Sequence, residues 1–424
     1  MSTSEPPDGP DQSSPAPDLD LPARRADQAR MTRDALTNDE SPIRIYPNDD
    51  PAEMAYMYQD RVLLVREADL DTVEGRLLSV RGERDWGILE GRSIPGVVTL
   101  LMPEATDLSA VCDDLDTFAR PGIAMPEHVV HITPAGCCPA TEPNPVLGQL
   151  DLVPALSTDP VATGAGVRVV VIDTGRRRDV EDDHPEWLSD ITGAFEGPGV
   201  GHYGGHGTFV CGVLRSQAPE CAIDVNAVTV RMGSVAETSL VSTLLEALKV
   251  DHPDLISMSA GTTTRNGLAP IALEALCLAL GEAGVLLVAA AGNEGTDEKF
   301  YPAAFNQAMP HVVAVGALDG NDQLADYSNR DWPTVYARGS EVVNAFPRGE
   351  YVYQEGRRKT LATEFPEGLV SWSGTSFATP TVAGIIAARA SRPGKDVPTA
   401  WAELKQVADQ GVIAGLPVLR PGDA

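Results

Sequence analysis

Positive charge is scarce in this sequence. Only 32 of the 424 residues are Lys or Arg, against 61 Asp or Glu, which gives a formal net charge of −29 at pH 7. A chain of this charge repels nucleic acid and anionic membrane surfaces, so we expect neither as a partner. The acidic excess is otherwise typical of a highly soluble protein.

Targeting and membrane signals are also missing. The first 25 residues contain no basic region followed by an apolar stretch, which excludes a secretory signal peptide. Arg24-Arg25 is followed by acidic and polar residues, which excludes a twin-arginine signal. No run of eighteen apolar residues occurs, so no segment is expected to span a membrane.

Cysteine is sparse and shows no pattern. The residues have no repeated spacing and form no C-x-x-C pair, which argues against a zinc site and against a disulfide framework. The missing signal peptide and this cysteine usage together predict a cytoplasmic protein. The cysteines are Cys112, Cys137, Cys138, Cys211, Cys221 and Cys277.

Composition divides the chain into four segments. Residues 1–45 are rich in Pro, Asp and Ser and poor in aromatics, so we expect a disordered leader. Residues 46–135 carry strand-like and helix-like apolar patterns. Residues 136–150 are rich in proline and are expected to form an extended linker. Residues 151–424 form the remaining, larger domain.

The patterns in residues 46–135 predict a small α+β module. Strand-like apolar runs alternate with two stretches of helical spacing, as expected for two strand-helix-strand passes. The strand-like runs cover 61–65, 96–102 and 128–132, and the helical stretches cover 69–80 and 108–118.

The larger domain alternates short apolar runs with helical patterns. Continuous apolar strands separated by helices indicate a parallel sheet that is covered on both faces. The predicted fold class is therefore α/β, a doubly wound and mostly parallel sheet preceded by the small α+β module. Residues 339–370 interrupt the alternation and predict a hairpin or loop insertion.

Ser376 has the surroundings of a nucleophile. It lies in Ser373-Gly374-Thr375-Ser376-Phe377-Ala378-Thr379-Pro380, just before a predicted helix of small residues. The positive end of that helix would favour negative charge close to the serine. Pro380 is expected in the first helical turn, where its missing N–H costs nothing.

Asp173 and His206 supply the groups that a serine nucleophile needs. Asp173 ends the apolar run at 169–172, and functional groups gather at the carboxyl ends of strands in an open α/β sheet. His206 lies in Gly204-Gly205-His206-Gly207-Thr208, where glycines are expected to leave the ring accessible for proton transfer. A carboxylate can orient such an imidazole and stabilise its cation.

The order Asp, His, Ser, with these local motifs and with His184-Pro185 after the aspartate, resembles the subtilisin family of serine proteases. The resemblance covers about residues 148–393 and implies a serine endopeptidase that acts through an acyl-enzyme intermediate. It also implies that Asn293, in Ala290-Ala291-Gly292-Asn293, donates to the oxyanion.

The resemblance further implies where a peptide substrate lies. Substrate would add as a strand between two backbone segments, and a third segment would border the primary specificity pocket. The segments are Met232-Gly233-Ser234, Ser259-Ala260-Gly261 and Ala290-Ala291-Gly292. No cofactor is required for this chemistry. Structural calcium occurs in the family, but no ligand set can be placed in this sequence, so the metal content is left open.

The biological role is less constrained by the sequence. We expect an intracellular processing or regulatory protease whose N-terminal module acts in cis, like the family's inhibitory pro-domain. Two alternatives stay open, an inactive peptide-binding scaffold and an esterase-type hydrolase on the same fold.

Overall fold

One parallel sheet forms the centre of the larger domain. The computed structural model describes residues 21–37, 42–89, 94–131, 140–146, 156–197, 200–227 and 232–424. Seven strands pair in the order β14-β13-β12-β11-β7-β9-β8, and each pairing is parallel. They are β7 (Arg168–Asp173), β8 (Thr192–Gly193), β9 (Ala222–Ala227), β11 (Leu255–Met258), β12 (Leu286–Ala290), β13 (Val312–Leu318) and β14 (Val335–Arg338).

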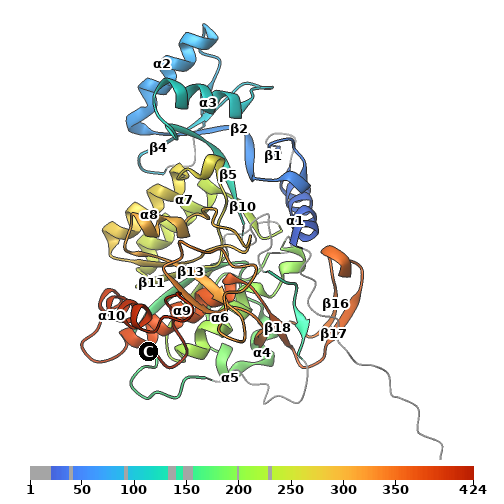
Figure 1. Cartoon of the computed structure of the whole chain (residues 1–424), viewed down its shortest axis with the longest axis vertical. Helices are drawn as coiled ribbons and strands as arrows, with labels where there is room; N and C mark the ends of the chain where they lie inside the picture. The colour runs from blue at the N-terminus through green and yellow to red at the C-terminus, as the bar shows by residue number, and fades with distance from the viewer. Residues whose placement is uncertain are drawn as a thin grey trace, which may run out of the picture.

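Helices cover both faces of this sheet, which confirms the predicted doubly wound class (Figure 1). One face carries α6 (His206–Gln217), α9 (Thr375–Ala390) and α10 (Val397–Gln410), and the other carries α7 (Glu237–Asp251) and α8 (Ile271–Ala283).

Strand β7 shows why its sequence is a continuous apolar run. Val169 and Val171 belong to the core under α6 and α9, whereas Val170 and Ile172 belong to the core under α7 and α8. Successive side chains of a strand point to opposite faces, so a strand covered on both faces must be apolar throughout.

The stretch Arg265–Ala283 is apolar enough to cross a membrane by length and composition alone. Its helical part, α8, instead contacts α7 and buries Ile271, Leu276 and Leu280 in the core. Packing within the fold therefore accounts for its apolar character.

The N-terminal module is an antiparallel sheet with two helices, as the sequence predicts. Its strands follow the order β5-β2-β4-β3, and β1 pairs with the first part of β2, ahead of the part that pairs with β4. The strands are β1 (Ile43–Tyr46), β2 (Tyr56–Arg66), β3 (Gly87–Ile88), β4 (Val97–Leu101) and β5 (Ala124–His131), and the helices are α2 (Leu70–Arg81) and α3 (Leu108–Phe118).

The module sheet lies between two layers of helices (Figure 1). Leu63 and Val65 pack under α2 and α3, while Val62 and Leu64 pack into the core that α7 and α8 share with the large sheet. One strand thus contributes alternate side chains to two different cores.

Two predictions about the flanking segments need correction. The expected disordered leader is wrong for residues 21–36, which form helix α1, and for residues 43–46, which form β1. After Pro22, α1 consists mainly of Ala, Arg and other strong helix formers and contains no Gly, so a composition averaged over 1–45 hides it. Residues 1–20 lie outside the described part.

The expected linker is only partly described. Residues 132–139 and 147–155, which include Cys137 and Cys138, lie outside the described residues. Between them, β6 (Asn144–Pro145) pairs with β18 of the larger domain, so this part is extended as expected but belongs to a sheet.

The insertion before Ser376 is a pair of nested hairpins, as predicted. β15 (Val342–Ala345) pairs with β18 (Leu369–Trp372), and β16 (Gly349–Val352) pairs with β17 (Ala362–Phe365). Short helices complete the described fold: α4 (Arg178–Asp183), α5 (Pro185–Leu188), and the 3₁₀ turns η1 (Pro51–Glu53), η2 (Glu67–Asp69), η3 (Gly201–Tyr203), η4 (Arg265–Gly267), η5 (Ala303–Gln307) and η6 (Gly356–Arg358). Strand β10 (Ser234–Ala236) of the larger domain pairs with β5 and so extends the module sheet.

Candidate active site

Asp173 and His206 form a buried pair at the carboxyl edge of the large sheet. Asp173 is the last residue of β7, and His206 is the first residue of α6. Nδ1 of His206 lies 2.8 Å from Oδ1 of Asp173, which also accepts the Thr174 N–H at 2.7 Å. With Nδ1 donating to the carboxylate, Nε2 is the nitrogen that can accept a proton.

Ser376 is the second residue of α9, not the residue before the helix as expected. Pro380 is accordingly the sixth residue, beyond the first turn, so its missing N–H leaves the Ser376 carbonyl without the usual i+4 donor. Oγ of Ser259 donates to that carbonyl at 2.9 Å. Because Pro380 cannot donate to it, the Ser376 carbonyl is left to bond with Ser259, which belongs to a predicted substrate segment.

The expected accessibility of the His206 ring is wrong for this structure. His206 and Ser376 are both 0% exposed, and the ring packs against Trp372 and Phe377 at centroid distances of 5.2 and 5.4 Å. Phe209 packs against the same two aromatic side chains. These large rings, which come from three separate segments, enclose the imidazole.

Nε2 of His206 and Oγ of Ser376 are buried, and neither forms a hydrogen bond with a described residue. They are thus the two polar atoms that the chemistry would use, held on adjoining elements. Catalytic hydrogen bonds are often long before substrate binds and tighten in the reacting complex.

Asn293 lies beside the nucleophile, as predicted. It follows β12 and is fully buried, and its Oδ1 accepts the Thr375 N–H at 2.8 Å. This bond turns the carbonyl oxygen of the amide toward α9 and leaves Nδ2 as the donor for an oxyanion, together with the Ser376 N–H in the first helical turn. In subtilisin, where this donor was measured, its loss lowers turnover by about 10²–10³.

Sequence reasoning missed Glu196, whose carboxylate fixes the backbone on both sides of His206. Its Oε1 accepts the Gly205 N–H at 2.6 Å and the Thr174 hydroxyl at 3.0 Å. The Thr174 hydroxyl in turn accepts the Gly207 N–H at 3.0 Å. Both neighbours of His206 are therefore tied, through one carboxylate, to the residue that follows Asp173.

Burial raises the pKa of the Glu196 carboxyl to about 7, against the opposing effect of its hydrogen bonds from Gly205 and Thr174. No local signal reveals this residue, because it lies in an irregular loop 22 positions after Thr174. Only the folded chain brings it behind the triad.

The predicted substrate segments border the same site. Ser259 follows β11 and bonds to Ser376, while Ala290 ends β12 and Ala291 continues toward Asn293. Gly292 adopts a φ of +97°, and a Cβ there would lie 2.6 Å from Nδ2 of Asn329, so only glycine fits.

Segments 232–234 and 259–261 flank the end of module strand β5. Ser234 opens β10, which pairs antiparallel with β5, and it directly follows Met232 and Gly233. Gly261 exchanges two backbone hydrogen bonds with His131, the last residue of β5, at 2.9 and 2.8 Å. Ala260 is buried in the core. The end of β5 thus lies between both segments.

Within the described part of the chain, no group of three or more His, Cys, Asp or Glu side chains is placed to hold a metal ion. The triad chemistry needs none. Structural calcium stays an open question.

The comparisons with known proteins agree with this geometry. The family model described as the subtilase family, peptidase S8, matches residues 164–410, which is more than half of the chain. An intracellular serine protease of Paenibacillus polymyxa is 28% identical over 285 residues, which cover 62% of this chain and 78% of that protein. Thermitase of Thermoactinomyces vulgaris is 29% identical over 266 residues, 59% of this chain and 84% of thermitase.

A solved structure reproduces the fold. Fervidolysin of Fervidobacterium pennivorans, described as a keratinolytic enzyme related to subtilisin, aligns with a TM-score of 0.58 at 18% identity. The alignment covers 86% of this chain and 61% of fervidolysin. At this identity the likeness concerns the architecture alone.

If Asp173, His206 and Ser376 act as one catalytic unit, the losses of activity on substituting them should not add. Ser376→Ala and His206→Ala should each remove nearly all peptide hydrolysis, and the double variant should lose no more than either single variant, because the residues act as one unit. Turnover of a peptide substrate is the measurement. More than about a hundredth of wild-type turnover in Ser376→Ala would contradict the assignment.

Glu196 predicts a pH effect that a packing role would not produce. Glu196→Gln keeps the acceptor oxygen but removes a titrating negative charge that lies near Asp173 and His206. We expect the acid limb of the kcat/KM profile to move down by about half a pH unit. Glu196→Ala, which also loses both hydrogen bonds, should instead lower kcat roughly tenfold at all pH values.

The same variant can be checked by stability. Burial raises the pKa of Glu196 from 4.5 when exposed to about 7 in the fold, so its contribution is present at low pH and is lost as pH rises through that range. The free energy of unfolding of Glu196→Gln relative to wild type should therefore increase between about pH 5 and 7. A difference that is independent of pH would exclude a titrating Glu196.

Proposed function

Because the chain belongs to the subtilase family of serine proteases, we propose that it is an intracellular processing or regulatory endopeptidase restrained by its own N-terminal module. In the reaction, Ser376 attacks the peptide carbonyl while Nε2 of His206 takes its proton, and Asp173 stabilises the imidazolium. Nδ2 of Asn293 and the Ser376 N–H donate to the oxyanion. The proton then passes to the leaving amine, and water hydrolyses the acyl-enzyme by the same steps in reverse.

The observation that carries the restraint is the position of β5. This strand pairs with β10 on one side and, at His131, with Gly261 on the other. A substrate strand added between the same two segments would need the same backbone N–H and C=O groups. Module and substrate therefore compete for one set of hydrogen bonds.

Helix capping holds the module in this place. The residues before α7 and α8, Ala236 and Pro270, offer no side-chain acceptor for the first helical N–H groups. Glu127 of β5 supplies one for α7, because its Oε1 accepts the Thr238 N–H at 3.2 Å and also the Thr238 hydroxyl. Such carboxylate caps also complement the positive end of the helix.

Ion pairs add to this interface. Arg265 of the larger domain bonds to Asp116 at 2.7 Å and to Asp113, both at α3, while Arg66 of β2 bonds to Glu274 of α8 at 2.6 Å. Because the module is tethered to the enzyme, its effective concentration is high, and moderate intrinsic affinity suffices to keep the site occupied.

The restraint predicts activation by a distant substitution. Glu127→Ala removes the cap of α7 without touching the triad, so it should weaken module docking and raise the initial peptidase rate of the intact chain by up to about tenfold. Initial rates on a short peptide, taken before any self-cleavage is visible by mass, give the measurement. Glu104→Ala, which changes a module side chain that is 90% exposed, is the matched control. Equal rates in all three proteins would favour a permanent accessory domain.

The intracellular location is supported by cysteine chemistry and by relatives. Four described cysteines, Cys112, Cys211, Cys221 and Cys277, are free and buried. Burial raises the pKa of the Cys112 and Cys221 thiols to about 12, which keeps them protonated and unreactive. The P. polymyxa protease and the major intracellular serine protease of Bacillus subtilis, 28% identical over 247 residues, are intracellular by name.

Thiol titration tests the location. Under denaturing, non-reducing conditions, protein isolated from its native host should show most of its six cysteines as free thiols. Three disulfides in that protein would contradict an intracellular site of action.

A further inference from the structure

Helix α1 connects the N-terminal module to the insertion that precedes the nucleophile (Figure 1). On the module side, Nη2 of Arg25 donates to the Met54 carbonyl at 2.7 Å, and Nη1 of Arg33 donates to the Asp49 carbonyl at 3.3 Å. On the other side the helix contacts η6, the turn between β16 and β17. One 16-residue helix therefore joins two parts of the chain that are far apart in sequence.

The contact with the insertion centres on the buried carboxylate of Glu355. Its Oε2 accepts from Nε and Nη2 of Arg24 at 2.9 and 2.6 Å and from Nε2 of Gln28 at 2.9 Å. Its Oε1 accepts the Tyr203 hydroxyl at 2.9 Å. Arg24 and Gln28 are four residues apart and so lie on one helix face. The side chains of Arg24 and Glu355 are 3% and 0% exposed, so this is a fully desolvated ion pair.

A second carboxylate fixes the surface that α1 meets. Oε1 of Glu142 accepts the Gln354 N–H at 2.7 Å and the Tyr351 hydroxyl at 3.1 Å, and its Oε2 accepts the Glu355 N–H at 3.2 Å. Arg24 also donates to the carbonyl of Ala140, two residues earlier. The hairpin loop is thus shaped by the segment that follows the module, and this orients Glu355 toward the helix.

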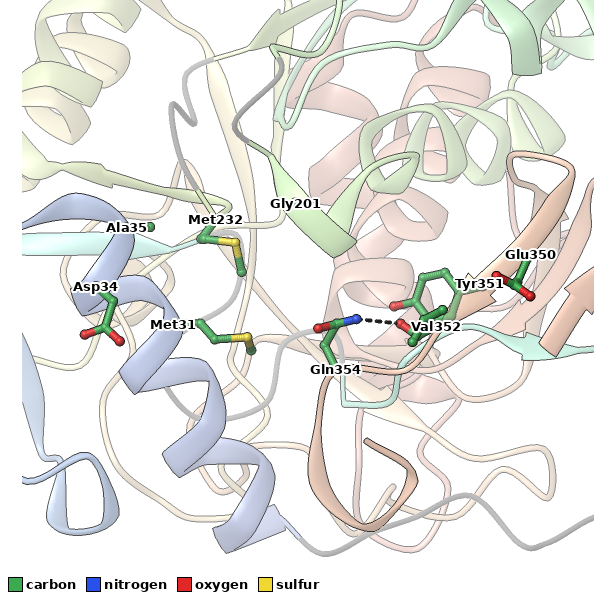
Figure 2. Close-up of a pocket in the computed structure, with 9 residues that line it drawn as sticks. All are labelled: Met31, Asp34, Ala35, Gly201, Met232, Glu350, Tyr351, Val352 and Gln354. Atoms are coloured by element: carbon green, nitrogen blue, oxygen red, sulfur yellow. Dashed lines mark hydrogen bonds between the residues drawn. The ribbon is translucent and has the colours of Figure 1, made fainter. Parts of the chain in front are cut away.

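The same helix covers the approach to the substrate segments. A cavity of about 600 Å³ lies between Met31, Asp34 and Ala35 of α1 and the hairpin residues 350–352 and 354. Met232, which begins the first substrate segment, lines it, as does Gly201, five residues before His206. In Figure 2, Met31 and Met232 point into the space that α1 closes on one side.

We propose that the hairpin surface around Glu355 is a docking site for an Arg-x-x-x-Gln helix, and that its occupant, residues 21–36 of this chain, clamps the substrate site shut. The proposal rests on the proposed protease function, but it uses contacts separate from those of β5. A chain released only at β5 would keep α1 across the site. Full activation then requires both contacts to open.

The ion pair makes this clamp both firm and reversible. Loss of Arg24 would leave Glu355 buried under the helix without its cation, which strongly favours undocking. Departure of the entire helix instead exposes Glu355 to water, where its charge is solvated. Loss of the Arg24 side chain alone therefore destabilises the docked helix, whereas the whole helix can leave without stranding a buried charge.

The experiment uses the full chain in two forms. In the inactive Ser376→Ala background, hydrogen exchange reports on docking, and in the Glu127→Ala chain, where the β5 contact is already weakened, initial cleavage rates report on gating. Arg24→Ala and Arg24→Ala/Gln28→Ala are compared with Arg30→Ala, a half-exposed position on the same helix whose partner Asp27 keeps its own bonds to Gly356 and Lys359 of the hairpin. Arg24→Lys, which keeps the charge but not the fork of donors, serves as a milder variant.

We expect exchange of the α1 amides to become at least tenfold faster in both Arg24→Ala proteins, with an intermediate effect in Arg24→Lys and none in Arg30→Ala. Cleavage of a folded protein substrate should rise about fivefold or more over that of Glu127→Ala alone, in the same order. Faster exchange with unchanged cleavage would overturn the clamp and make α1 a structural brace. Unchanged exchange would overturn the docking site itself.

The two proposals fail in different ways. If no variant, wild type included, cleaved any peptide, the proposed function would fall and the gating role with it. The exchange data would still decide whether Glu355 holds α1.

Discussion

The register of the parallel sheet is the constraint on which the active site depends. Ile172 of β7, Met258 of β11 and Ala289 of β12 lie in one row across the three strands. The next positions, Asp173, Ser259 and Ala290, therefore come together at the carboxyl edge, as parallel strands require. A shift of one residue in either pairing would move the acid, the serine that bonds to the nucleophile, or the pocket wall away from the others.

Around this edge, the site is stabilised by hydrogen bonds that cross between elements. Pro380 frees the Ser376 carbonyl for Ser259, Thr375 fixes the Asn293 amide, and Glu196 links the Asp173 and His206 segments. Each bond uses an atom other than the reacting one and restrains the backbone that carries the reacting residue. Such preorganised support is what allows a buried triad to stabilise charge without rearrangement.

The N-terminal part of the chain completes polar groups that the larger domain leaves unsatisfied. Glu127 caps α7 from the module, and Arg24 neutralises Glu355 of the insertion. Both contacts bury a carboxylate between the N-terminal part and the larger domain. If the N-terminal part were removed, water would have to replace the hydrogen bonds that it makes to the larger domain.

Local sequence determined the chemistry and most of the fold. The motifs around Asp173, His206 and Ser376 are short and self-contained, and apolar periodicity marks each long strand and helix because burial of one or both faces imposes it. The same reasoning reached Asn293 only through family resemblance, because Asn before Glu-Gly is also ordinary turn chemistry.

Tertiary structure decided what no local pattern encodes. Glu196 acquires its role because folding desolvates a loop carboxylate behind the triad, and α1 forms where average composition indicated disorder because Glu355 and the module supply its partners. The enclosure of His206 likewise depends on aromatic rings from distant segments. The sequence alone specified which residues can react, because each of them lies in a short motif whose conformation depends mainly on its own neighbours. Their support and their burial depend on contacts between separate segments, some of them more than a hundred positions apart, which only the folded chain brings together.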